Sequence, residues 1–260
     1  MPLRDHYLTV LRQGFVPIWV ADGFDAVLLA EAAVAAGAGA VEITCRRSTV
    51  RDDIRRVRRR FPELTVLAGS LVDDGPLFDH LRRRRPDMPS IAELADLGVH
   101  GLVSAMPLSE ATLARYAATH LLMPGVETLA DAVRALEAGA HFAKFFTASA
   151  TGEAARVRTL TSAPTHGLLP VFVTGGVTLA TVAPYVAAGA ALLGSGWDVL
   201  LGPCYQQLQA KSDLTTISLA LRAFLDASRD ARRAHNAPML HPDDATLLAQ
   251  VPFHHPFPAG

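Results

Sequence analysis

The sequence contains very little lysine, although it has many other basic side chains. Its lysines and arginines number 24, and only Lys144 and Lys211 are lysines. The acidic residues number 25, so the formal net charge is −1 at pH 7. Such a balanced charge gives no reason to expect a nucleic acid or an anionic membrane as a partner. Because lysine is so rare here, a lysine within an apolar segment needs an explanation.

Cysteine and long apolar runs are also scarce. The two cysteines, Cys45 and Cys204, lie far apart on dissimilar segments, which favours a reduced protein without disulfides. No apolar run approaches the ~20 residues that a membrane span requires. The N-terminal segment 1–14 is amphipathic and lacks the apolar core of a secretory signal. We therefore expect a cytoplasmic protein that does not contact a membrane.

Half of the 260 residues are hydrophobic, and they form short apolar segments that alternate with Ala/Leu-rich helical stretches. Near-continuous apolar strands separated by helices predict an α/β fold in which helices cover a parallel sheet. Eight such units favour a single (β/α)8 TIM barrel, which typically takes about 250 residues, over an open sheet. The predicted strands are 15–20, 40–45, 65–70, 101–105, 120–125, 142–146, 169–176 and 191–196.

No interdomain linker interrupts this pattern, so we expect one barrel domain over residues 1–235. Its last long helix is predicted at roughly 213–235. Residues 236–260 follow as a C-terminal helical extension and tail, which we expect to pack on the barrel or on a neighbouring subunit. The histidines of this tail match no standard spacing of metal ligands, so no metal is expected.

Lys144 lies inside the segment HFAKFFTAS (141–149), which otherwise reads as a buried strand. A buried ammonium usually finds a partner or loses its proton. Glu42 is the other residue charged at pH 7 within a predicted strand, so both side chains should point into the barrel near its mouth, where TIM-barrel active sites form. A lysine with a lowered pKa can form a Schiff base with a ketone, and a carboxylate can act as general acid/base. A structural salt bridge is the competing interpretation.

Glycine-rich turns follow the last two predicted strands, as Thr174-Gly175-Gly176 and Gly194-Ser195-Gly196. Their backbone N–H groups lie next to helix starts, where this fold commonly binds anions. A single glycine-rich turn of this kind often has only a structural role, as a tight connection between a strand and a helix. Two of them at consecutive strand ends favour a site for a phosphate or another anion.

Six segments, VEITCRR, AGS, MPG, FAKFF, VTGGVT and GSGW, occur in an order and at spacings that resemble the 2-keto-3-deoxy-6-phosphogluconate (KDPG) / 4-hydroxy-2-oxoglutarate (KHG) aldolase family. The resemblance covers roughly residues 5 to 200. It implies a homotrimeric (β/α)8 barrel that acts as a class I (Schiff-base) aldolase without metal or other cofactor. Such a lyase cleaves a 2-keto-3-deoxy-6-phospho sugar acid or 4-hydroxy-2-oxoglutarate to pyruvate plus glyceraldehyde 3-phosphate or glyoxylate.

The resemblance also assigns roles to individual residues. It makes Lys144 the Schiff-base lysine and Glu42 the general acid/base. Arg46 and Ser70 would bind the carboxylate of the pyruvyl half of the substrate, and Phe146 would wall the pocket. The phosphate would be held by the two glycine-rich turns, with Gly196 as an alternative to Ser195 for the last position. The residues of these turns are Thr174, Gly175, Gly176, Gly194, Ser195 and Gly196.

Two other functions stay open on the sequence. A phosphosugar isomerase, epimerase or synthase would use the same barrel and anion turns, but it leaves the apolar surroundings of Lys144 unexplained. A non-catalytic aldolase-like scaffold could instead bind nucleic acid through the basic runs 51–60 and 81–85. Acidic residues around these runs, and the lack of interleaved aromatics, favour solvated helix faces. We therefore expect a small-molecule 2-keto acid as substrate and no nucleic-acid partner.

Overall fold

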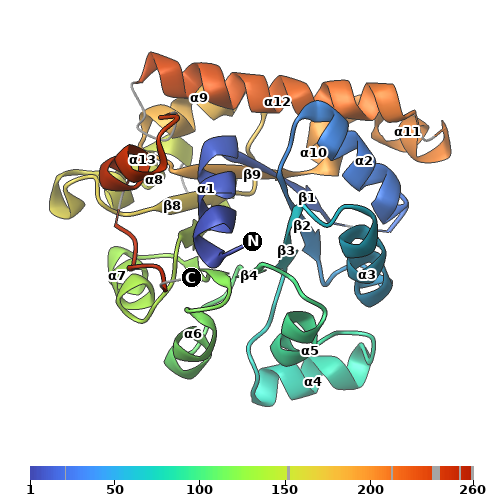
Figure 1. Cartoon of the computed structure of the whole chain (residues 1–260), viewed down its shortest axis with the longest axis horizontal. Coiled ribbons are helices and arrows are strands. Elements are labelled where there is room, and N and C mark those ends of the chain that lie inside the picture. The colour runs from blue at the N-terminus through green and yellow to red at the C-terminus, as the bar shows by residue number, and fades with distance from the viewer. Residues whose placement is uncertain (21, 151–152, 212, 236–240, 252, 259–260) are drawn as a thin grey trace.

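The computed structural model of the chain is a barrel of parallel strands surrounded by helices, as Figure 1 shows. It describes residues 1–20, 22–150, 153–211, 213–235, 241–251 and 253–258. The predicted α/β barrel fold with extra C-terminal helices is confirmed. The strands are Phe15–Trp19 (β1), Ala40–Thr44 (β2), Thr65–Gly69 (β3), Gly101–Val103 (β4), Leu121–Met123 (β5), Gly125–Val126 (β6), Ala143–Phe145 (β7), Val171–Thr174 (β8) and Leu192–Gly196 (β9).

Pro124 divides the fifth predicted strand into two segments, so the described residues contain nine strand segments where eight were predicted. Proline cannot donate to a strand ladder, and it therefore interrupts pairing on one side. β5 pairs with β4 and β6 pairs with β7, which gives the order β5-β4-β3-β2-β1-β9-β8-β7-β6. The backbone N–H groups of His141 and Phe142 donate to the carbonyl of Leu122. The chain on either side of Pro124 thus joins the two edges of the sheet and closes the barrel.

The helices pack outside the strands and begin and end at recognisable caps. The side chain of Asp25 accepts hydrogen bonds from the backbone N–H groups at the start of one helix, and Gly37 ends the same helix in the left-handed conformation. Short 3-10 turns lie at Ala148–Ala150, Ala163–Thr165 and Gly202–Cys204. The helices are Leu3–Gln13 (α1), Ala26–Ala36 (α2), Val50–Arg60 (α3), Pro76–Arg84 (α4), Ile91–Asp96 (α5), Glu110–Tyr116 (α6), Leu129–Glu137 (α7), Glu153–Thr161 (α8), Leu179–Ala187 (α9), Trp197–Leu201 (α10), Tyr205–Lys211 (α11), Leu214–Ala234 (α12) and Asp244–Gln250 (α13). None of the described helices is long and apolar enough to cross a bilayer.

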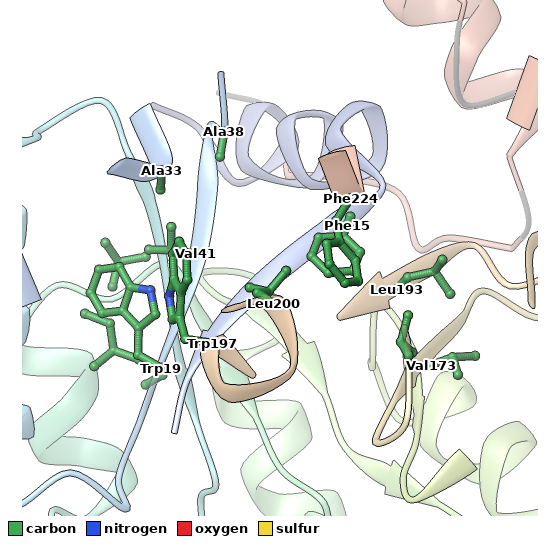
Figure 2. Close-up of a cluster of buried hydrophobic side chains, with 14 of the residues drawn as sticks. Phe15, Trp19, Ala33, Ala38, Val41, Val173, Leu193, Trp197, Leu200 and Phe224 are labelled. Atoms are coloured by element: carbon green, nitrogen blue, oxygen red, sulfur yellow. The ribbon is translucent and has the colours of Figure 1, made fainter. Parts of the chain in front are cut away.

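The hydrophobic core has two parts. The larger one lies between the sheet and the surrounding helices, where the ring of Phe15 from β1 meets that of Phe224 from α12 (Figure 2). The smaller one fills the barrel interior with side chains such as Leu67 and Phe172, on which α1 packs. α1 lies at the end of the barrel where the strands begin, since the Nδ1 atom of His6 is 2.9 Å from the hydroxyl of Thr65. One end of the barrel is thereby closed, and the other is left for a site.

The last long helix, α12, runs along α2 and α9 on the outside of the barrel (Figure 1). It carries Arg232, which is 1% exposed. The Arg232 guanidinium donates to the carbonyls of Leu11 and Ala191, and it fills the space beside Gly14. It has no acidic partner among the described residues. Its side chain therefore ties the end of α12 to α1 and to the start of β9.

Part of the predicted C-terminal extension packs on the closed end of the barrel. Asp244 of α13 forms an ion pair with Arg12 of α1 at 2.5 Å, and the ring of Phe257 lies 5.1 Å from that of Tyr7. Residues 236–240, 252 and 259–260 of the extension lie outside the described residues. The division into a barrel domain over 1–235 and an extension stays a prediction.

Candidate active site

A cavity of about 460 Å³ opens at the end of the barrel where the strands finish, the end that carries the active site in TIM barrels. Its walls contain every predicted site residue except Gly194. Gly194 lies within β9 and faces Phe172 and the backbone of Val16, so the structure does not bring it to the cavity. The predicted residues that line the cavity are Glu42, Arg46, Ser70, Lys144, Phe146, Thr174, Gly175, Gly176, Ser195 and Gly196.

Lys144 and Glu42 project from β7 and β2, which lie on opposite sides of the barrel. The Nζ atom of Lys144 is 3.6 Å from Oε1 of Glu42, and the two residues are 4% and 1% exposed. Burial lowers the pKa of Lys144, Glu42 partly opposes this effect by raising that pKa, and the positive charge of Arg46 lowers it further. The net result is a buried lysine with a pKa below its usual value.

The second carboxylate oxygen of Glu42 is available to a bound molecule. Oε2 is buried and makes no hydrogen bond within the described part of the chain, and the same holds for the Thr174 hydroxyl. Gly69 leaves the space that the Glu42 carboxylate occupies, because a Cβ atom at this position would overlap Oε1. Leaving a buried acceptor without a partner costs about 1–3 kcal/mol. The free Oε2 atom and the Thr174 hydroxyl are therefore features expected of a site that binds a polar ligand.

Arg46 and Ser70 lie on the same side of the cavity as Glu42, just after β2 and β3. Arg46 is exposed and has no ion-pair partner among the described residues. Ser70 has a φ of 57°, a left-handed conformation that costs a non-glycine residue on the order of 1 kcal/mol or more; strained residues of this kind cluster at functional sites. A free guanidinium and a hydroxyl next to Lys144 can bind a carboxylate.

The glycine-rich turn after β8 presents backbone to the cavity. Gly175 and Gly176 have φ values of 78° and 91°, a conformation that side-chain-bearing residues rarely adopt. In addition, a Cβ atom at Gly176 would overlap the side chain of Ser149. The turn after β9 differs, because the hydroxyl of Ser195 donates to the carbonyl of Val177 at 2.5 Å. The proton of that hydroxyl is therefore already donated within the protein and is not available to a ligand.

The protein-family model for KDPG and KHG aldolase matches residues 89–217. The KHG/KDPG aldolase of Escherichia coli (strain K12) is 27% identical over 186 residues, which cover 71% of this chain and 80% of that protein. The chain is related to the KDPG and KHG aldolases. The resemblance found in the sequence is thus confirmed, and it supports aldolase, and hence lyase, chemistry as the general class of function.

Solved aldolase structures share the fold of this chain. The 2-keto-3-deoxy-6-phospho-gluconate aldolase from Zymomonas mobilis ATCC 29191 superposes with a TM-score of 0.63 at 24% identity, covering 82% of this chain and 94% of that structure. The KDPG aldolase from Legionella pneumophila, determined with pyruvate captured at low pH as a covalent carbinolamine intermediate, gives a TM-score of 0.67 at 19% identity and covers 86% and 98%. The barrel found here therefore shares its fold with these aldolase structures.

Within this aldolase-related barrel, the sequence reasoning missed Asp198. Its side chain lines the cavity next to Ser195 and Gly196. The predicted site residues lie at strand ends, whereas Asp198 lies in the first turn of the following helix, α10. The sequence does contain a signal for this residue, because an acidic side chain two positions after a turn assigned to phosphate is unexpected. The remaining missed lining residues are the apolar side chains of Ile18, Val20, Leu71, Val72, Ala105, Met106 and Val199.

No group of three or more His, Cys, Asp or Glu side chains suited to a metal ion lies within the residues that the structure describes. Cys45, in the loop directly after β2, is buried, and burial raises the pKa of its thiol to about 12. It is thus a poor nucleophile at neutral pH. The reactive groups of the cavity are an amine and carboxylates.

Proposed function

We propose that this chain is a class I aldolase, which cleaves a 2-keto-4-hydroxy acid to pyruvate and an aldehyde through a Schiff base on Lys144. The observation that carries the proposal is the buried amine of Lys144, with its lowered pKa, beside the carboxylate of Glu42. A lysine with a lowered pKa has a larger fraction of free amine at neutral pH, and only the free amine attacks a ketone. The relationship to KDPG and KHG aldolases supports the same chemistry.

The reaction begins when the Nζ atom of Lys144 adds to the C2 carbonyl carbon of the substrate. Loss of water from the resulting carbinolamine gives a protonated imine. Glu42 then accepts the proton of the C4 hydroxyl, and the C3–C4 bond breaks as its electron pair moves toward the imine. The aldehyde leaves, and the remaining enamine is protonated at C3. The protonation gives the imine of pyruvate with Lys144. Hydrolysis of this imine releases pyruvate and restores the amine.

Arg46 and Ser70 would hold the carboxylate of the pyruvyl half, because they are the free cation and hydroxyl beside Lys144. Phe146 would form the wall of the pocket. The substrate class contains 2-keto-3-deoxy-6-phospho sugar acids and 4-hydroxy-2-oxoglutarate, with glyceraldehyde 3-phosphate or glyoxylate as the aldehyde product. The chemistry assigned to these residues requires no metal or other cofactor. A homotrimer and a cytoplasmic location stay predictions.

Trapping with borohydride tests the proposal directly. Pyruvate should form an imine with Lys144, and sodium borohydride should reduce that imine to a stable carboxyethyl group on the lysine. Peptide mapping by mass spectrometry would locate the modified residue. Lys211 is the internal control, because it is exposed at the end of α11 and does not line the cavity. A protein that carries no adduct on Lys144 under these conditions would overturn the proposed mechanism.

A further inference from the structure

Asp198 places a negative charge at the end of the cavity where the sequence predicts a phosphate. Its carboxylate lies directly over the last glycine of the turn after β9, because a Cβ atom at Gly196 would overlap Oδ1 of Asp198. The carboxylate forms no ion pair or hydrogen bond with the described residues. Burial raises the pKa of Tyr205, and the charge of Asp198 raises it further. An uncompensated carboxylate therefore faces whatever the aldehyde half of the substrate carries.

The positive charges that line the cavity come from parts of the chain other than the turn of Asp198, namely β7 and the loop after β2. Among the residues that line it, the cations are Lys144 and Arg46, and Arg46 is near enough to Lys144 to lower its pKa. Both are thus placed for the pyruvyl half. The neighbouring recess of about 260 Å³ shares Asp198 with the cavity and contains no lysine or arginine among its lining residues. Those lining residues are Trp19, Val20, Phe24, Leu29, Trp197, Asp198 and Tyr205, of which Figure 2 shows the two indoles.

The hydroxyl predicted to bind phosphate is also not free. Ser195 donates its proton to the carbonyl of Val177, and the alternative position, Gly196, has no side chain. The other groups that the predicted phosphate site brings to the cavity are neutral: the backbone of Gly175 and Gly176 and the unpartnered hydroxyl of Thr174. Lys144 and Arg46 would be taken by the pyruvyl half, and no other lysine or arginine lines the cavity. A phosphate dianion would therefore approach the Asp198 carboxylate without a cation of its own to offset the repulsion. A hydroxyl group would instead donate to that carboxylate and accept from the neutral donors.

We propose that Asp198 selects substrates whose aldehyde half is hydroxylated and uncharged, which makes the preferred substrate an unphosphorylated 2-keto-3-deoxy sugar acid. The inference rests on the proposed aldolase function and names the substrate class of the same site. It reverses the expectation that the two glycine-rich turns hold a phosphate. The carboxylate of Asp198 accepts hydrogen bonds from the distal hydroxyls, and the aromatic recess beside it receives the end of the carbon chain.

The test compares kcat/KM for pyruvate release from 2-keto-3-deoxygluconate and from its 6-phosphate ester. The full-length protein should favour the unphosphorylated substrate by about tenfold or more, the factor that corresponds to about 1.4 kcal/mol. Asp198→Asn keeps the shape and removes the charge, so the ratio should shift by about tenfold or more toward the phosphate ester. Asp74→Asn is the matched control, because Asp74 is an exposed aspartate in the loop that follows β3 and does not line the cavity. It should leave the ratio unchanged.

The borohydride adduct on Lys144 separates this inference from the proposed function. If the adduct forms and the wild type prefers the phosphate ester, or cleaves neither compound, the inference about Asp198 is wrong while Schiff-base chemistry stands. The inference is also overturned if Asp198→Asn leaves the ratio of the two kcat/KM values unchanged. If no adduct forms and neither compound is cleaved, the proposed function itself is wrong.

Discussion

The amine of Lys144 lies 3.6 Å from Oε1 of Glu42, and neither residue is more than 4% exposed. This distance exceeds the roughly 2.7–2.9 Å of a charge-assisted hydrogen bond. A purely structural salt bridge at this depth would need short contacts and partners for both carboxylate oxygens to offset desolvation. Here Oε2 of Glu42 has no partner among the described residues, and burial still lowers the pKa of Lys144. The geometry favours a reactive pair over a structural one.

Lys144→Arg should fold and lose turnover by several orders of magnitude. Arginine keeps the positive charge beside Glu42, but its guanidinium stays protonated and cannot become a neutral nucleophile. Steady-state release of pyruvate from the preferred substrate measures the loss, and circular dichroism checks the fold. Lys211→Arg is the matched control and should retain normal activity. Near-normal turnover by Lys144→Arg would exclude a Schiff base at this position.

Glu42→Gln should separate formation of the Schiff base from cleavage. The amide keeps the shape of the side chain but cannot accept the C4 hydroxyl proton, so kcat should fall by about 10²–10⁴-fold. Loss of the negative charge also removes the effect that raises the Lys144 pKa, so the pyruvate adduct should still form. Borohydride trapping and kcat are measured on the same preparation. If the yield of the trapped adduct fell as much as kcat, Glu42 would instead act in imine formation.

Gly69→Ala should impair catalysis through Glu42. The new methyl group would overlap Oε1 of Glu42, and the cheapest response is for the end of this flexible side chain to move away from Lys144. The melting temperature should therefore change little, while kcat falls and the borohydride adduct persists. In a double-mutant cycle, Gly69→Ala should cost much less in the Glu42→Gln background. Full additivity of the two effects would show that Gly69 acts on something other than Glu42.

The fold should lose stability in mild acid because of histidines at the closed end of the barrel. Nδ1 of His141 accepts from the N–H of Leu122, and Nδ1 of His100 accepts from that of Val66, so a proton on either nitrogen would break a hydrogen bond to a strand. Burial lowers the pKa of His141 to about 4 and that of His100 to about 3. The unfolded chain binds these protons near pH 6.5, before the folded chain does. Stability is thus complete above about pH 6.5 and decreases as pH falls toward 4.

Thermal melts between pH 7.5 and 4.5 measure this decrease. The variant His141→Gln offers an amide oxygen to the N–H of Leu122 and does not titrate, so its melting temperature should depend less on pH than that of the wild type. A wild-type melting temperature that is constant over this range would contradict the assignment. The carboxylates with lowered pKa values, such as Asp73, lose their contribution only at lower pH.

The sequence predicted the fold and most of the cavity lining because the relevant signals are local. Lys144 and Glu42 stood out as charges within apolar strands, which predicted that both point into the barrel near its mouth. The break at Pro124 was not predicted, because a proline at the end of an apolar run also fits the end of one strand. The direction of the Ser195 hydroxyl and the presence of Asp198 in the cavity depend on how a turn and the next helix pack. Hydrophobic periodicity does not report that packing.

The buried guanidinium of Arg232 has a consequence for the order in which the molecule can be completed during synthesis. Its hydrogen bonds reach Leu11 and Ala191, so the first helix and the last strand are fixed together by a residue that is made after every strand. A nascent chain that has exposed residues only through Gly196 contains all the strands from β1 to β9, yet it lacks the Arg232 hydrogen bonds that tie α1 to the start of β9. Contacts of such long sequence separation form late and slowly. The barrel of this protein is therefore expected to become protease-resistant only after α12 has left the ribosome.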